Sequence, residues 1–249
     1  GLAARRHCRR RGLPFTTSYH TRFPEYVRAR TGLPLDWGYA LQRRFHAPAA
    51  RIMVTTPTLH AEMVRRRFPP PALWSRGVDT VLFRPHDTDV LAGLPRPIFT
   101  YVGRVAVEKD LHLFLDADLP GSKVIVGDGP MRQTLQARYP DAHFVGAQHG
   151  ETLAGHYAAS DVFVFPSSTD TFGLVLLEAL ASGVPVAALP VPGPNDVIGD
   201  SGVGVLDHDL RRAALAALDI PRADCRDFAL RHSWTNSARD FLANLETLG

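Results

Sequence analysis

The stretch Pro166-Ser-Ser-Thr-Asp170-Thr-Phe-Gly-Leu-Val-Leu-Leu-Glu178-Ala-Leu-Ala-Ser-Gly-Val-Pro185 decides the fold of this chain. The run before it, 161–165, is rich in β-branched and aromatic residues and predicts a buried parallel strand. After a polar turn, an apolar helix is expected over 172–182, ended by Ser182-Gly183. The N-terminus of that helix would lie at the carboxyl end of the strand. Open α/β sheets bind ligands there, and a helix N-terminus favours anions.

Strands and helices alternate regularly from Pro97 onward. Strands are expected over 98–102, 123–126, 143–145, 161–165, 185–189 and 203–206, and helices near 111–118, 131–138, 152–159, 172–182 and 210–218. This alternation predicts a parallel sheet with helices on both faces. A helix over 222–231 and another from Ser233 to about Leu248 complete the expected elements.

The first part of the chain carries a shorter set of the same kinds of element. We expect a helix over 2–11 stopped by Gly12, a strand over 13–20, a helix over 37–50, a strand over 51–55, and a helix from Thr56-Pro57 to about Arg67. The proline run at 69–71 predicts an irregular connection as far as Pro85. The fold class is therefore α/β, with domains at 1–85 and 86–232 and a terminal helix at 233–249.

Composition limits the classes of protein to consider. The chain has 249 residues, 45% of them apolar and 21% charged, which is typical of a globular protein. Its net charge of +3 is too small an excess to indicate a nucleic-acid partner. No apolar run is long enough to cross a bilayer, and no signal-peptide pattern is present. Cys8 and Cys225 have no neighbours at metal-ligand spacing, which favours reduced thiols and a cytoplasmic location.

The expected first helix is strongly basic. Its arginines are Arg5, Arg6, Arg9, Arg10 and Arg11. A solvated helix face is the plainer interpretation. The alternative is a surface that contacts the anionic head groups of a membrane peripherally.

Cations and glycines follow the strands of the second domain. Gly103 and Arg104 end the first strand, and Lys109 precedes the next helix. A guanidinium and an ammonium at this edge suit a diphosphate, although each alone would be an ordinary surface charge. The glycine-rich turn at 127–130 lacks the lysine and spacing of a P-loop. The backbone at Val145 and Gly146, after the third strand, is a candidate contact for the edge of a base.

Two carboxylates, Asp170 and Glu178, have seven residues between them. Asp170 is equally well explained as a helix cap. Glu178 lies on an otherwise apolar helix, and a buried carboxylate needs a partner. Its side chain should lean toward the helix N-terminus, where ribose hydroxyls could serve. His20 ends a strand of the first domain, either as a site residue or as a hydrogen-bonded structural histidine.

These residues together resemble glycosyltransferase family 4, retaining enzymes with the GT-B architecture of two Rossmann-like domains. The acidic pair ahead of Ala-Leu-Ala-Ser-Gly-Val-Pro resembles the family signature, with Asp170 in place of the usual glutamate. Further motifs of the family are matched by Gly103-Arg104 with Lys109, Val126-Gly-Asp-Gly-Pro130, Gly77-Val-Asp79 and Ser18-Tyr-His20-Thr. The chain looks most similar to mannosyl- and sulfoquinovosyl-transferases that act on lipid acceptors.

The resemblance implies a role for each candidate residue. Arg104 and Lys109 would neutralise the leaving diphosphate, Glu178 would hold the ribose, and His20 would contact the donor sugar near its reacting carbon. The donor sugar and phosphate would be held by Asp170 and the backbone at Phe172, Gly173 and Leu174. The donor would be GDP-mannose or a UDP-sugar, and the acceptor a lipid or glycan hydroxyl. No metal or other cofactor is implied, because the two cations take its place.

Measured against this family, the N-terminal domain would be incomplete, since the glycine-rich loop after its first strand is absent. We therefore expect an N-terminally truncated fragment that is inactive in transfer. The final helix would cross back to the first domain with an under-packed apolar face. Two alternatives stay open, a nucleotide-sugar epimerase of the same architecture and a non-catalytic nucleotide-sugar-binding fragment.

Overall fold

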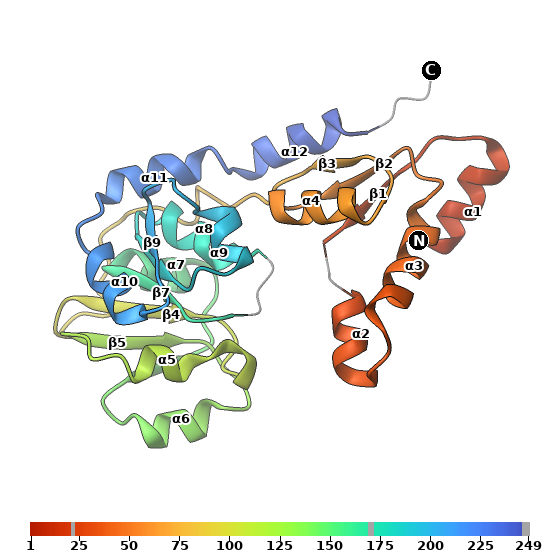
Figure 1. Ribbon diagram of the computed structural model, residues 1–249. Helices are drawn as coiled ribbons and strands as arrows, with labels where there is room; N and C mark the ends of the chain where they lie inside the picture. The colour runs from red at the N-terminus through yellow and green to blue at the C-terminus, as the bar shows by residue number, and fades with distance from the viewer. Residues whose placement is uncertain (21–22, 169–171, 246–249) are drawn as a thin grey trace. The chain divides into compact units, whose positions relative to one another are not determined.

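The computed structural model describes residues 1–20, 23–168 and 172–245 (Figure 1). The chain divides into two compact units, Gly1–Arg76 with Thr235–Gly249 and Gly77–Trp234. We call them the N-terminal unit and the C-terminal unit. Each is built on its own parallel sheet. Among the described residues, no helix is long and apolar enough to cross a membrane.

The sheet of the C-terminal unit is parallel throughout, in the order β6-β5-β4-β7-β8-β9. Its strands are β4 (Ile98–Val102), β5 (Ser122–Val126), β6 (His143–Gly146), β7 (Val162–Phe165), β8 (Val186–Ala188) and β9 (Gly204–Leu206). The chain first adds strands on one side of β4 and then continues on the other side from β7. The carboxyl ends of β4 and β7 therefore form a topological switch point, the usual place for a ligand in such a sheet.

Helices cover both faces of this sheet. They are α5 (Leu111–Leu115), α6 (Arg132–Arg138), α7 (Gly150–Ala159), α8 (Leu174–Ala181), α9 (Pro192–Val197), α10 (Leu210–Ala217) and α11 (Arg222–Leu230). Neighbouring strand residues point to opposite faces, so Phe163 packs in the core with α7, α8 and α11, and Val164 in the core with α5 and α10. Burial on both faces explains why β7 is apolar along its whole length and why β4 is apolar or aromatic except at Thr100, which is also buried.

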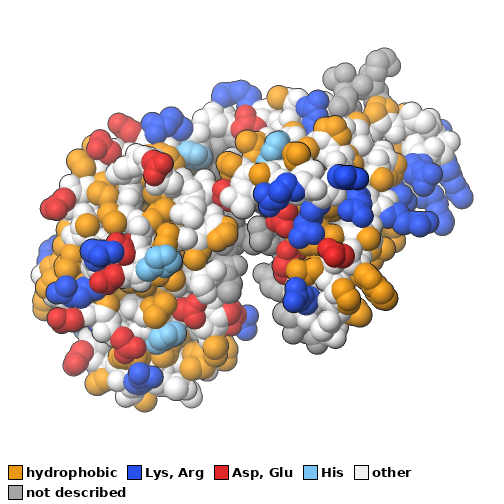
Figure 2. Space-filling model, in the orientation of Figure 1, with side chains coloured by type: hydrophobic (Ala, Val, Ile, Leu, Met, Phe, Trp, Pro, Cys, Tyr) orange, Lys and Arg blue, Asp and Glu red, His pale blue; other side chains and the backbone are white. Residues whose placement is uncertain are grey.

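The N-terminal unit has a smaller parallel sheet in the order β1-β2-β3. Its elements are α1 (Leu2–Arg11), β1 (Thr16–Tyr19), α2 (Phe23–Thr31), α3 (Leu35–His46), β2 (Arg51–Val54), α4 (Pro57–Arg65), β3 (Pro71–Leu73) and α12 (Trp234–Ala243). The residue that begins α4, Thr56, caps the helix as predicted, since its hydroxyl accepts from the amide of Leu59 at 3.2 Å. Helix α1 ends at Gly12 and buries none of its residues. Lys and Arg side chains gather over it on the molecular surface (Figure 2).

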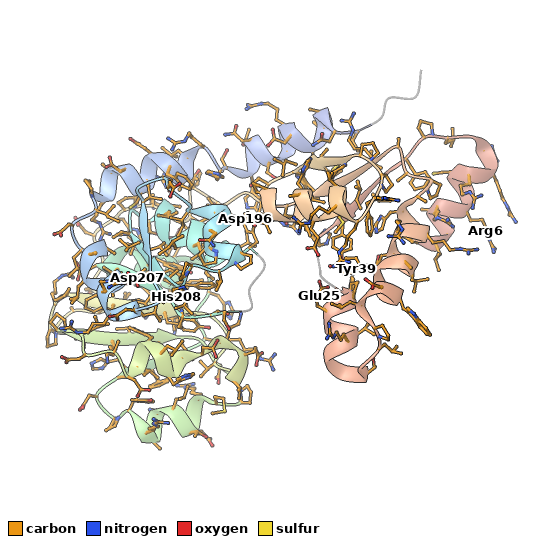
Figure 3. The ribbon with its side chains drawn as sticks, in the orientation of Figure 1. Arg6, Glu25, Tyr39, Asp196, Asp207 and His208 are labelled. Atoms are coloured by element: carbon orange, nitrogen blue, oxygen red, sulfur yellow. The ribbon has the colours of Figure 1, made fainter. Side chains whose placement is uncertain are left out.

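A buried tyrosine fastens the helices of this unit together. The hydroxyl of Tyr39 lies 2.5 Å from Oε1 of Glu25 and 2.9 Å from Oε1 of Glu62 (Figure 3). The guanidinium of Arg66 stacks 3.4 Å from the centre of the Tyr39 ring and bonds Glu62 at 3.1 Å. One side chain of α3 thus anchors both α2 and α4, and Tyr39 is 1% exposed.

Helix α12 packs on the segment that follows β3. Its Phe241 ring lies 5.0 Å from that of Trp74, whose indole nitrogen donates to the carbonyl of Ser237 at 3.1 Å. The Ser237 hydroxyl donates to the carbonyl of Ser75 at 2.8 Å, and the Asn244 amide to that of Leu73 at 2.9 Å. The outer side of the helix is less well covered, with Leu242 65% exposed.

Three local expectations were wrong. The proline-rich segment after α4 forms β3, which is compatible with Pro71 because an edge strand pairs on one side only. Helices α2 and α9 fall where no element was expected. The final helix ends at Ala243 rather than near Leu248. The strand predicted at 98–102 coincides with β4.

Candidate functional site

The loops after β4, β5 and β6 are joined by backbone hydrogen bonds at the carboxyl edge of the C-terminal sheet. The amide of Gly103 donates to the carbonyl of Val126 at 3.0 Å, and the amide of Gly127 to that of Gly146 at 2.8 Å. One step further on, the amide of Val105 donates to the carbonyl of Asp128 at 2.9 Å. The predicted glycine-rich turns therefore form one continuous backbone layer.

Gly127 has no room for a side chain. Its φ is 146°, and a Cβ built there would lie 1.8 Å from the carbonyl oxygen of Gly103. Any larger residue would have to push the β4 and β5 loops apart. Gly127 of the Val126–Pro130 turn must therefore be glycine because of the adjacent Gly103 carbonyl, whether or not a ligand binds here.

Arg132 reinforces the same layer. It donates to Oδ2 of Asp128 at 3.2 Å and to the carbonyl of Phe144 at 3.3 Å, while Oδ1 of Asp128 accepts from the Gly129 amide at 2.7 Å. The carbonyls of Val145 and Gly146 are already engaged, by the side-chain amide of Gln148 at 3.1 Å and by the amide of Gly127.

The predicted cations lie on the loop after β4. The side chain of Arg104 is 65% exposed and its guanidinium is 3.7 Å from Oε1 of Glu108, four residues later in the chain. Lys109 ends a short 3-10 helix, η1 (Val107–Lys109). The next residue, Asp110, accepts a 2.6 Å hydrogen bond from the hydroxyl of Ser168. This bond ties the Lys109 segment to the loop after β7, across the switch point.

Helix α8 begins at the same edge. Gly173 precedes it in a left-handed conformation with φ 76°, and none of the described side chains caps the helix. Phe172 and Gly173 are half-buried, and Leu174 is 41% exposed. The first amides of α8 are therefore suited to an anionic ligand. Asp170, the predicted partner of this helix start, lies outside the described residues.

Glu178 has a protein partner that the sequence did not reveal. Its Oε2 accepts a hydrogen bond of 2.8 Å from the hydroxyl of Tyr157, a fully buried residue of α7. Burial raises the pKa of the Glu178 carboxyl, while the bond from Tyr157 acts in the opposite direction. The partner that a buried carboxylate needs is therefore supplied, at one oxygen, by Tyr157.

His20 belongs to the N-terminal unit, whereas the other described candidates belong to the C-terminal unit. It directly follows β1 and keeps access to solvent. The pKa of its imidazole is lowered, first by partial burial and second by the positive charge of Arg76. The neutral ring, a hydrogen-bonding group, is therefore favoured near neutral pH.

Other polar residues at this edge escaped the sequence analysis. Ser167 lies two residues after the end of β7, and its buried hydroxyl has no hydrogen-bond partner among the described residues. Asp207 and His208 follow β9, and Asp196 lies in α9 (Figure 3). Asp207 is held by a two-pronged contact from Arg212, at 2.6 and 2.7 Å. Within the described part of the chain, no group of His, Cys, Asp and Glu is arranged to hold a metal ion.

Comparisons with known proteins agree with this geometry. A family model described as "Glycosyl transferases group 1" matches residues 96–220, and one described as "Glycosyltransferase Family 4" matches residues 1–82. The first spans half of the chain. The chain therefore belongs to the family 4 glycosyltransferases.

Two curated relatives match the chain over most of its length. It is 34% identical to a GDP-mannose-dependent alpha-mannosyltransferase of Mycobacterium tuberculosis, over 96% of this chain and 68% of the relative. It is 32% identical to the sulfoquinovosyl transferase of Arabidopsis thaliana, over 77% of this chain and 41% of the relative. The chain thus spans about two thirds of the length of the mannosyltransferase and 41% of the length of the sulfoquinovosyl transferase.

The solved structures show the GT-B fold. A sucrose-phosphate synthase of Thermosynechococcus elongatus superposes with a TM-score of 0.78 and 25% identity, over 93% of this chain and 67% of that protein. The Anabaena protein HepE, solved with UDP and glucose, has the same TM-score at 15% identity, over 98% of this chain and 75% of that protein. The expected class, α/β with two Rossmann-like units, is confirmed.

Proposed function

We propose that this chain carries the donor site of a glycosyltransferase that moves a hexosyl group from a nucleoside diphosphate-sugar to a hydroxyl of a lipid or glycan. The observation that supports this most is the convergence at the switch point. There the glycine layer, the loop with Arg104 and Lys109, and the start of α8, which none of the described side chains caps, share one sheet edge. Such an edge offers two cations and the first amides of a helix to a diphosphate.

In this proposal, Arg104 and Lys109 stabilise the charge that develops on the diphosphate as the bond to the anomeric carbon breaks. A diphosphate would replace the 3.7 Å contact of Arg104 with Glu108, an exposed pair that costs little to separate. The acceptor hydroxyl attacks the same face of the sugar, and its proton passes to the leaving phosphate, so that configuration is retained. Asp170 and His20 would contact the donor sugar.

The donor is proposed to be GDP-mannose or a UDP-sugar. The name of the mycobacterial relative supports GDP-mannose, and HepE with UDP and glucose supports a uridine nucleotide. We propose that binding needs no metal, since the two cations and the amides of α8 would supply the neutralising charge. Val145 and Gly146 would lie along the base, using groups other than their engaged carbonyls.

Calorimetric titration of the chain with GDP and UDP, with and without EDTA, tests the proposal. We expect one nucleotide to bind in both conditions and Arg104→Ala to weaken it about tenfold or more, the value of a charge-assisted hydrogen bond. Arg138→Ala is the matched control, because Arg138 is also 65% exposed and lies 3.8 Å from Asp116. Absence of heat with both nucleotides would refute a donor site, and loss of binding in EDTA would refute metal independence.

We also propose that the N-terminal unit contacts anionic membranes peripherally. Arg6, Arg9 and Arg10 of helix α1 are exposed to solvent, and Figure 3 shows Arg6 pointing away from the helix. Leu2 on α1 and Trp37 and Leu41 on α3 are each 71% exposed. Arg5 joins the two helices by donating to the carbonyls of Arg44 and Phe45, at 3.1 and 2.9 Å. Basic and apolar side chains together suit an anionic interface.

Sedimentation with phosphatidylglycerol vesicles tests this contact, with phosphatidylcholine vesicles as the reference. We expect binding to the anionic vesicles only, weakened by high salt and by the double change Arg6→Glu and Arg10→Glu. Equal binding to both kinds of vesicle, or none to either, would contradict the proposal.

A further inference from the structure

The buried ring of Tyr157 is held by two aromatic neighbours, so its hydroxyl has a fixed position and points toward Glu178. Its ring is fully buried, 5.6 Å from Phe83 in an edge-on contact and 5.7 Å from Phe163. Burial raises the pKa of this phenol well above 10, so the hydroxyl keeps its proton and remains a donor. Its hydrogen bond goes to Oε2 of Glu178 at 2.8 Å.

Glu178 is the carboxylate that this hydroxyl orients. It is the charged residue of the otherwise apolar α8, four residues after Leu174, where the helix begins. Long helical side chains lean toward the N-terminus, which here is the ligand edge of the sheet. A carboxylate has two oxygens and several lone pairs, and Tyr157 occupies one of them. Because the hydrogen bond from Tyr157 restrains rotation of the Glu178 carboxylate, its remaining lone pairs keep a fixed orientation.

We propose that Tyr157 is a positioning residue that fixes the Glu178 carboxylate for recognition of a ribose diol. The inference rests on the proposed donor site, because it requires a nucleotide. A carboxylate held at one oxygen can accept from hydroxyls of the sugar without losing rotational freedom on binding. A nucleotide that lacks a ribose hydroxyl should then bind more weakly than the parent nucleotide. Loss of the Tyr157 hydroxyl should reduce this difference in affinity.

A purely structural bond would behave differently. If the Tyr157 hydroxyl only satisfied a buried carboxylate, its loss would lower stability and weaken ribonucleotides and deoxynucleotides by the same factor. A positioning role acts on the ratio of the two affinities instead. The ratio of dissociation constants for the 2′-deoxy or 3′-deoxy nucleotide and the parent nucleotide therefore separates the two roles.

The experiment is a calorimetric titration of the full chain with GDP, UDP and their 2′-deoxy and 3′-deoxy forms. For the nucleotide that binds, we expect the wild type to prefer the ribose form about tenfold or more, as for a hydrogen bond to a charged group. Tyr157→Phe should reduce that ratio at least about threefold. Tyr39→Phe is the matched control, since Tyr39 is 1% exposed and also bonds carboxylates, and it should leave the ratio unchanged.

Glu178→Asp is a second variant, for use if Tyr157→Phe does not fold. It keeps the charge but withdraws the carboxylate by one methylene from Tyr157, so the ratio should fall here too. If either variant, Tyr157→Phe or Glu178→Asp, folds and keeps the wild-type ratio of dissociation constants, the positioning role of Tyr157 is overturned. A wild type that binds without preferring ribose would overturn it as well. If the wild type binds neither GDP nor UDP, the proposed donor site fails first, and the two failures are distinguishable.

Discussion

Replacing Gly127 with alanine tests the backbone layer on which the candidate site is built. The new Cβ would lie 1.8 Å from the carbonyl oxygen of Gly103 and 2.9 Å from its carbon. Ordinary contact needs more than about 3 Å, so the two loops would have to separate by more than about 1 Å. Because both contacts are backbone atoms, no side-chain rotation can relieve them.

The loss of folding free energy expected for Gly127→Ala has two parts. The positive φ of 146° disfavours alanine by about 1–2 kcal/mol. Separating the loops would also break the three hydrogen bonds that the amides of Gly103, Gly127 and Val105 donate to the carbonyls of Val126, Gly146 and Asp128, each worth about 1 kcal/mol. We therefore expect Gly127→Ala to lower the free energy of unfolding by about 4–5 kcal/mol.

Gly93→Ala separates these parts. Gly93 also has a positive φ, 85°, but a Cβ there would have nothing within 4 Å. It should cost about 1 kcal/mol, from the strained φ partly offset by the smaller entropy of the unfolded chain. Urea unfolding followed by circular dichroism measures both variants. Equal losses at the two positions would refute the close approach of the loops.

Three further changes test other parts of the structure. His46, 4% exposed and 2.9 Å from the Thr17 hydroxyl, has its pKa lowered to about 4 by burial. Between pH 6.5 and 4 the unfolded state therefore binds a proton that the folded state does not. The free energy of unfolding, measured by urea titration, should fall by about 2 kcal/mol from pH 7 to pH 5. The variant His46→Phe should show a smaller fall. Burial raises the pKa of Cys225 to about 12, so a thiol reagent should label Cys8 rapidly and Cys225 only in denaturant; two rapid equivalents would contradict this. Thr56→Ala should cost about 1 kcal/mol in urea unfolding through loss of the α4 cap, whereas Thr56→Ser should not, and equal effects would argue against the cap.

The alternation of the C-terminal unit could be predicted because each strand is a short apolar run between clear turn residues. β4 and β7 are buried on both faces, so each appears in the sequence as an almost unbroken run of apolar and aromatic residues that is easy to detect. β3 could not be found in this way, because its prolines favour a turn locally. Its pairing with β2 depends on tertiary contact and on having one open edge.

Parts of the candidate site were open to prediction for a similar reason. The glycine turns and Arg104 directly follow predicted strands, and parallel strands bring their ends together. The partner of Glu178 was out of reach, because Tyr157 lies 21 residues away on another helix and its spacing resembles that of any core tyrosine. The contact of Arg104 with Glu108 was equally out of reach, because Arg104 lies in the loop after β4 and the helical spacing of neighbours does not apply there.

The route of the chain has a consequence for its synthesis. Sequence order and spatial order differ, because the N-terminal unit includes α12, made after the whole C-terminal unit. Trp74 gains its ring contact with Phe241, and the carbonyls of Leu73 and Ser75 gain their donors, only when that helix arrives. On a ribosome, the C-terminal unit would be complete while the unit begun first still lacked a packing face. The segment around Trp74 would then be exposed to proteases and chaperones until α12 had left the ribosome and packed against it.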